Sequence, residues 1–196
     1  LWVLKKYGLI FLLVCFQGFI GWYMVSSGLI DRVDVSHYRL SLHLVIAFVI
    51  LSVVFWEFLK LTKIQTQYSS IHINLLKFFL LLLFLQLIIG AFVSGMDAGK
   101  IYNTWPMMGS SYFPDDSQFI EFLNVSVFNN PSIVQFIHRN LAYLIIGIYI
   151  YILFFTIKDR NEIFKMPVIF IGVSLFLQIV LGILTILSGV KILYAS

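Results

Sequence analysis

Two of the four histidines, His43 and His138, lie about one turn or more inside one end of a long apolar segment. Ionisable side chains are rare at such depths, and those that occur there are usually functional. A neutral imidazole in this setting is suited to ligate a haem iron. For either histidine alone, a hydrogen bond to a neighbouring helix or a place among lipid headgroups explains the residue equally well.

An arginine accompanies each of these histidines. Arg39 precedes His43 by four residues, so the two share one helix face, and Arg139 directly follows His138. Gln135 lies four residues before Arg139 and shares its face. A haem has an apolar macrocycle and two carboxylates, so its site needs an iron ligand, a cation and an apolar wall. The alternative is that the arginines snorkel to the headgroups, which suits Arg39 better than the deeper Arg139.

The other two histidines are weaker candidates. His37 lies in a loop directly before the second apolar segment, where it could serve entry to a site. His72 lies in a polar loop at residues 65–74, where a solvated side chain is expected. Nothing in the sequence resembles a hydrolase triad, a phosphate-binding loop or a carboxylate pair for acid–base catalysis.

The composition is that of a polytopic membrane protein. Of the 196 residues, 61% are hydrophobic and 11% are charged, and the mean hydropathy is +0.99. Soluble domains are about 45–50% apolar and about 25% charged. The net charge of +4 is spread over segment ends and forms no stripe, so no nucleic-acid partner is expected. Cys15, the one cysteine, lies in an apolar run and forms no intrachain disulfide or metal cluster.

Five apolar segments are long enough to cross about 30 Å of hydrocarbon as helices. They cover residues 7–26, 40–61, 75–93, 133–157 and 167–187. Because a helix satisfies its backbone hydrogen bonds internally, we expect an all-α fold, a polytopic transmembrane helical bundle.

The basic residues predict the orientation of these segments. The positive-inside rule places the more basic set of loops in the cytoplasm or the mitochondrial matrix. Residue 1 is therefore expected on that side, and the long loop, residues 96–131, is expected outside. The inner set contains Lys5, Lys6, Lys60, Lys63, Lys77, Lys158, Arg160 and Lys165; the outer set contains Arg32, Arg39, Lys100, Arg139 and Lys191.

The long loop is rich in aromatic residues, Asn, Gly and Pro, so we expect a folded cap. Its first part carries four residues suited to a lid over the outer helix ends, namely Asp97, Tyr102, Asn103 and Trp105. Such a lid would shield a haem edge. Equally well, its aromatic residues would lie at the membrane interface as a belt.

A repeated pattern links three of the segments. The first and fifth read Gln-x3-Gly-x5-Ser-Gly, at residues 17–28 and 178–189, and the third has a shorter echo at residues 86–95. Small residues and glutamines are common at contacts between membrane helices. Two matching copies of the whole pattern indicate an internal duplication.

The duplication predicts a larger parent protein. His43 follows Gln17 by 26 residues, so its counterpart after Gln178 falls near position 204. We expect two four-helix halves, eight helices in all, of which this chain is an internal fragment with the middle five. Residues 1–70 would belong to the N-terminal half, and residues 71–196, with the long loop, would supply the first three helices of the C-terminal half.

Several motifs carry a family resemblance, and two parts of them are quite specific, DAGxxYN from Asp97 and QFxHR from Gln135. The motifs are GWYMVSSG from Gly21, VSHYRLSLHL from Val35, GAFVSGMDAG from Gly90 followed by Tyr102-Asn103 and Trp105-Pro-Met-Met, and QFIHR from Gln135. Together they resemble haem A synthase, most of all its mitochondrial and alphaproteobacterial branch, over almost the whole chain. The resemblance implies two pseudo-symmetric four-helix halves, the architecture that the repeat also predicts.

The resemblance also implies four histidine ligands, one pair in each half. The first member of the C-terminal pair matches His138, which would ligate a protohaem (haem b) cofactor. The second member of the N-terminal pair matches His43, on the side where the substrate haem O is oxidised. The other member of each pair would lie outside this chain, so the fragment alone is expected to be inactive.

The implied reaction oxidises the C8 methyl group of haem O to a formyl group and gives haem A for terminal oxidase biogenesis. The expected partners are an external electron donor of ferredoxin-like type, haem O synthase and the lipid bilayer. The expected location is the bacterial inner membrane or the mitochondrial inner membrane.

The residues alone leave two other functions open. A b-type cytochrome that passes electrons to quinone would also use histidine ligands. However, His43 and His138 lie toward the same outer face, whereas a transmembrane relay usually needs haems near both faces. A transporter or assembly scaffold without haem would use the histidines and arginines to bind a substrate or partner helices.

Overall fold

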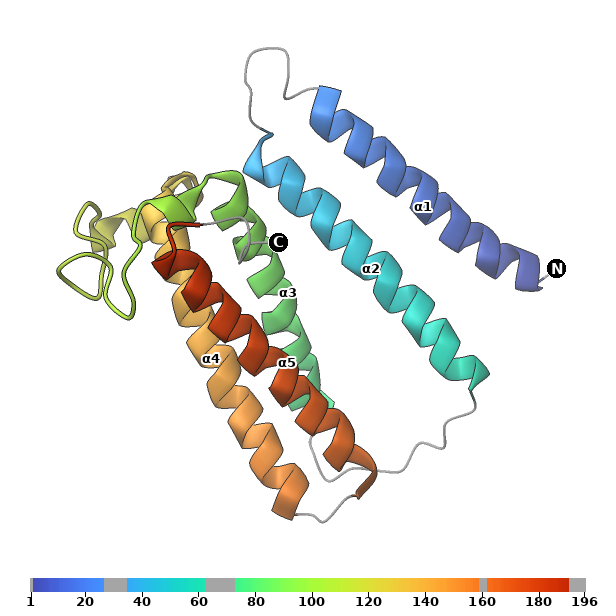
Figure 1. Ribbon diagram of the computed structural model, residues 1–196. Helices are drawn as coiled ribbons and strands as arrows, with labels where there is room; N and C mark the ends of the chain where they lie inside the picture. The colour runs from blue at the N-terminus through green and yellow to red at the C-terminus, as the bar shows by residue number, and fades with distance from the viewer. Residues whose placement is uncertain (1, 27–34, 63–72, 159–161, 191–196) are drawn as a thin grey trace. The chain divides into compact units, whose positions relative to one another are not determined.

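The computed structural model describes residues 2–26, 35–62, 73–158 and 162–190. Its long helices are α1 Trp2–Ser26, α2 His37–Leu61, α3 Ile73–Gly95, α4 Pro131–Lys158 and α5 Glu162–Leu187 (Figure 1). Three short 3-10 helices lie in the long loop: η1 Ala98–Lys100, η2 Phe119–Leu123 and η3 Val125–Asn129. The all-α class is confirmed, because the described residues form helices and loops with one isolated β-bridge, Met108 to Ser111.

All five predicted segments are confirmed as helices that are long and apolar enough to cross a membrane. Helix α5 begins five residues before the predicted start. The difference arises because its first turns carry the charged residues Glu162 and Lys165, which lie outside the apolar run. Hydropathy therefore located the membrane-spanning part of α5 and missed its polar beginning.

The chain divides into two compact units, Leu1–Thr66 and Gln67–Ser196. In the first unit, α1 and α2 lie side by side and antiparallel (Figure 1). In the second unit, α4 packs against both α3 and α5. The assignment of the two parts of the chain to a substrate-haem side and a cofactor-haem side stays a prediction.

The core of the second unit lies along α4. One cluster of buried apolar side chains joins its three helices: Phe79 and Leu82 from α3, Ile145 and Ile152 from α4, and Val168 from α5. Many other large apolar side chains of these helices are exposed. This is expected for helices that face lipid, because lipid tails are as apolar as the side chains and burial alone does not drive helix association.

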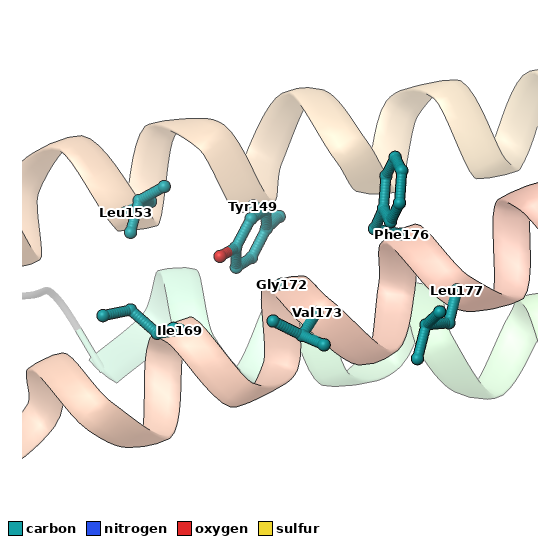
Figure 2. A pocket seen from close by; sticks show the side chains of 7 residues that line it. All are labelled: Tyr149, Leu153, Ile169, Gly172, Val173, Phe176 and Leu177. Carbon is teal, nitrogen blue, oxygen red and sulfur yellow. The ribbon is translucent and has the colours of Figure 1, made fainter.

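Helices α4 and α5 approach closely at Tyr149 and Gly172. The Tyr149 hydroxyl donates a hydrogen bond to the main-chain carbonyl of Val168 (3.1 Å). The Tyr149 side chain points from α4 toward Gly172, at the centre of an apolar groove of about 350 Å³ (Figure 2). A Cβ atom at position 172 would overlap the Tyr149 Oη atom, so this packing requires glycine.

We expect Gly172→Ala to lower the free energy of unfolding by about 1–3 kcal/mol, the usual cost of overpacking, because the Tyr149 ring must move. Thermal unfolding of the detergent-solubilised protein measures the change. Gly147→Ala in α4 is the matched control, since among the described residues a Cβ atom there meets no heavy atom within 4 Å. Equal melting temperatures for the two variants would contradict this account of the packing.

Candidate functional site

In the first unit, Gln17 of α1 contacts His43 of α2. The Gln17 Nε2 atom donates a hydrogen bond to the main-chain carbonyl of His43 (2.9 Å) and lies 3.2 Å from each ring nitrogen. One turn along α1, a Cβ atom at Gly21 would lie only 3.1 Å from the His43 Cε1 atom. The imidazole therefore occupies the space that a side chain at position 21 would take.

In the second unit, Gln86 of α3 contacts His138 of α4 in the same way. The Gln86 Nε2 atom donates to the main-chain carbonyl of His138 (3.2 Å) and lies 3.3 Å from the ring Nε2 atom. A Cβ atom at Gly90 would lie 3.2 Å from the His138 Cε1 atom. The two candidate ligands thus have matching surroundings in the two units.

Sequence reasoning identified the repeat but missed these contacts, because it assigned glutamine and glycine to general helix packing. In the first unit the signal was the spacing of 26 residues from Gln17 to His43. In the second unit the spacing from Gln86 to His138 is 52 residues, since the long loop intervenes. The shared Gln-x3-Gly pattern was the only signal common to both.

The surroundings of both histidines fit a haem ligand. The His138 Nδ1 atom is buried and has no hydrogen-bond partner among the described residues, and the same holds for the Oε1 atoms of Gln17 and Gln86. In the part of the chain that the structure describes, no group of three or more His, Cys, Asp or Glu side chains gathers. Single histidines of this kind suit a metal that brings other ligands with it, as haem iron does.

Arg139, only 7% exposed, holds the long loop against α4. Its two terminal nitrogens donate hydrogen bonds to the main-chain carbonyls of Thr104 (2.9 Å), Tyr102 (3.1 Å) and Met107 (3.3 Å). Gln135 is buried and donates to the Tyr102 carbonyl as well (3.1 Å). The Arg139 Nε atom is buried and has no hydrogen-bond partner in the described residues. That Arg139 and Gln135 bind a haem stays a prediction; both contact the loop.

The remaining polar candidates of the first unit lie near the start of α2. The Arg39 guanidinium lies 5.1 Å from the centre of the Tyr23 ring, a cation–π contact between α2 and α1. The ring of His37 lies 4.1 Å from that of Tyr38. The role of Arg39 toward a haem stays a prediction, and His72 lies outside the described residues.

The predicted lid residues belong to a folded segment of the long loop. Asp97 has a left-handed backbone conformation (φ +53°) and forms an ion pair with Lys100 (2.9 Å). Asn103 donates hydrogen bonds to the main-chain carbonyls of Gly99 (2.8 Å) and Ile186 (3.0 Å). The second of these bonds ties the loop to the end of α5.

Two further side-chain hydrogen bonds attach the loop to α4. The Trp105 indole N–H donates to the Tyr143 hydroxyl oxygen (3.0 Å), and the Tyr112 hydroxyl donates to the Asn140 side-chain oxygen (2.6 Å). All four predicted lid residues thus lie in a loop that is fixed to the helices of its own unit. Their action as a lid over a haem stays a prediction.

Two carboxylates, Asp115 and Asp116, accept hydrogen bonds in the long loop. Burial tends to raise the pKa of Asp116, but hydrogen bonds from Ser132, Tyr102 and other donors outweigh burial and hold the pKa below its usual value. The Ser110 main-chain N–H lowers the pKa of Asp115, and serine hydroxyls add to the effect. Both groups are therefore charged at neutral pH and accept hydrogen bonds from the loop.

Residues 2–196 match the family described as cytochrome oxidase assembly protein, COX15-CtaA. The chain belongs to this family. It is therefore a multi-pass membrane protein, and the resemblance drawn from its motifs is confirmed.

Curated relatives carry the name heme A synthase. The Pelagibacter ubique protein is 51% identical over 192 residues, which are 98% of this chain and 56% of the relative. The Rickettsia bellii (strain RML369-C) protein is 37% identical over 198 residues (97% and 58%), and the Flavobacterium johnsoniae protein is 36% identical over 198 residues (96% and 57%). The chain thus spans a little over half the length of these relatives. No solved structure matches it.

We expect Arg139→Lys to release the loop segment at residues 102–107, because one ammonium group cannot reproduce the fork of bonds that a guanidinium makes. Each lost bond to a charged group is worth about 1.5–3 kcal/mol, so amide hydrogen exchange of this segment should accelerate by about tenfold or more. Lys100→Gln is the control, since its ion pair is exposed and such pairs contribute about 0–1 kcal/mol. Unchanged exchange in Arg139→Lys would rule out the anchoring role.

Acid should loosen the same loop through Asp116. Its folded-state pKa lies below the ordinary 3.8, so its stabilising contribution is present above that value and is lost as the pH falls through the folded-state pKa. Pepsin cleavage of the loop between pH 5 and pH 2 checks this. Wild type should become cleavable only at the acid end, whereas Asp116→Asn should be cleavable throughout; identical profiles would refute the role of Asp116.

Proposed function

We propose that the whole protein is a haem A synthase, which oxidises the C8 methyl group of haem O to a formyl group. The observation that supports this most is the pair of histidines, His43 and His138, each held between a glutamine and a glycine of the neighbouring helix. Relatives named heme A synthase match nearly the whole of this chain. The substrate haem O and the product haem A follow from that proposed activity.

We assign different roles to the two histidines. His138 is proposed as an axial ligand of a haem b cofactor, and His43 as a ligand on the side that binds haem O. Both are half-buried side chains on membrane-spanning helices. The neutral form of an imidazole is the one that ligates iron. When bound, haem supplies the redox chemistry of the reaction.

Arg139 is proposed to place a positive charge beside the cofactor. It is buried, it forms no ion pair among the described residues, and its Nε–H is still without an acceptor. The three loop carbonyls that it contacts are dipoles and leave its net charge intact. A propionate of a haem is an anion suited to such a site. Arg39 is proposed to play the corresponding part in the first unit.

The long loop is proposed as a cover over the cofactor end of α3 and α4, on the outer side of a bacterial or mitochondrial inner membrane. Its attachment to α4 and α5 through Arg139, Trp105 and Asn103 supports a fixed cover. The opposite side would carry residue 1. Haem O synthase as supplier of the substrate and a ferredoxin-like protein as electron donor complete the proposal.

The roles of the two histidines are separable by mutation in the full-length protein. We expect His138→Ala to lose the tightly bound haem b, measured as the haem content of the purified protein. We expect His43→Ala to retain haem b but to form no haem A, measured in a pigment extract of cells. His72→Ala, in the predicted polar loop, is the control for both. Full haem b content in His138→Ala, or normal haem A in His43→Ala, would overturn the respective assignment.

A further inference from the structure

We propose that Gln17 with Gly21, and Gln86 with Gly90, are positioning residues that seat the two imidazoles. An imidazole seat is defined here as the glutamine together with the glycine four residues after it. The inference rests on the proposed haem function and names residues for which that function alone gives no role. The glutamine fixes the position of the histidine-bearing helix along the axis of its neighbour, and the glycine leaves room for the imidazole ring.

The two seats match in geometry although they differ in sequence context. From the hypothetical glycine Cβ atom, the distances to the histidine Cε1 and Nδ1 atoms are 3.1 and 3.6 Å at Gly21, and 3.2 and 3.7 Å at Gly90. The histidine follows its glutamine by 26 residues in one unit and by 52 in the other. The recurrence of the same glutamine, glycine and imidazole arrangement despite unlike connections indicates a defined arrangement instead of incidental packing.

The glycines of the seats differ from other glycines of the same helices. Among the described residues, a Cβ atom at Gly18, one turn from Gly21, meets no heavy atom within 4 Å, and the same is true at Gly147 on α4. At both seats the nearest atoms belong to one side chain, the imidazole, and none of them belongs to the backbone of the neighbouring helix.

The glutamines act on both the backbone and the ring. Each donates to the main-chain carbonyl of its histidine, which fixes how far the two helices are displaced along each other. Each also lies within hydrogen-bond distance of a ring nitrogen, while its own Oε1 atom is buried without a partner in the described residues. The bond to the carbonyl and the close contact with the ring together hold the imidazole in one orientation beside the amide.

A third glutamine–glycine pair with the same spacing lies on α5. Gln178 is exposed there, and among the described residues a Cβ atom at Gly182 meets no heavy atom within 4 Å. An exposed glutamine amide on a membrane-spanning helix needs a polar partner. The Gln178 side chain is therefore expected to meet a polar group.

The test uses the full-length protein loaded with haem b and has readouts other than activity: haem b affinity, the low-spin electron paramagnetic resonance spectrum and the reduction potential. Gly90→Ala pushes a methyl group against the His138 ring. We expect it to lower haem b affinity by about 10–100-fold, the range found for outer partners of metal ligands, and to change the spectrum. Gly147→Ala, the matched control, should leave all three unchanged.

Gln86 is tested separately, which also covers the case that Gly90→Ala fails to accumulate. Gln86→Leu removes the polar partner and should alter the spectrum and the potential. Gln86→Glu offers a charged acceptor in its place and should shift the reduction potential downward, because a more basic imidazole favours ferric iron.

Gly21→Ala should leave the haem b spectrum as it is and impair haem O binding, with Gly18→Ala as its control.

The outcomes separate this inference from the proposed function. A wild-type protein that binds no haem b contradicts the proposed function itself. A wild-type protein that binds haem b, together with Gly90→Ala and Gln86→Leu variants of unchanged affinity, spectrum and potential, overturns the seats and leaves the function in place. A change in Gly90→Ala that Gly147→Ala reproduces equally also overturns them.

Discussion

The hydrogen bond from a glutamine amide to the main-chain carbonyl of a histidine on the neighbouring helix is the contact on which the rest of this structure depends. Lipid surrounds these helices, so apolar contact alone gives little preference for one displacement along the helix axis over another. A directional bond between polar groups gives such a preference. Gln17 and Gln86 each make this bond, and each places one histidine opposite a glycine.

Helix α4 carries this constraint into the long loop. His138 faces α3, while the next residue, Arg139, reaches the loop carbonyls of Tyr102, Thr104 and Met107. Neighbouring helical positions differ by about 100° around the axis, so one turn of α4 contacts both structures at once. A shift of α4 along α3 would therefore disturb the histidine and the loop together. The two are coupled through α4.

Much of the fold was predictable from the sequence, and less of the site. The five helices follow from apolar runs of sufficient length, and the two candidate histidines follow from the cost of an ionisable group at membrane depth. The partners of Arg139 could not be foreseen, because main-chain carbonyls carry no sequence signal. The pairing of Gln86 with His138 was concealed by their sequence separation of 52, although the pairing of Gln17 with His43 had the same pattern at shorter range.

Matching seats in unlike surroundings would allow one repeated unit to serve the two roles that we propose for it. Beside His138 stands Arg139, buried and bound to loop carbonyls. Arg39, four residues before His43, is less buried and makes a cation–π contact with the ring of Tyr23. A buried charge acts on its neighbours through a medium of low dielectric, whereas a partly exposed charge is screened. Under the proposed function, the seats would set equal ligand geometry, and the arginines would set unequal electrostatic fields.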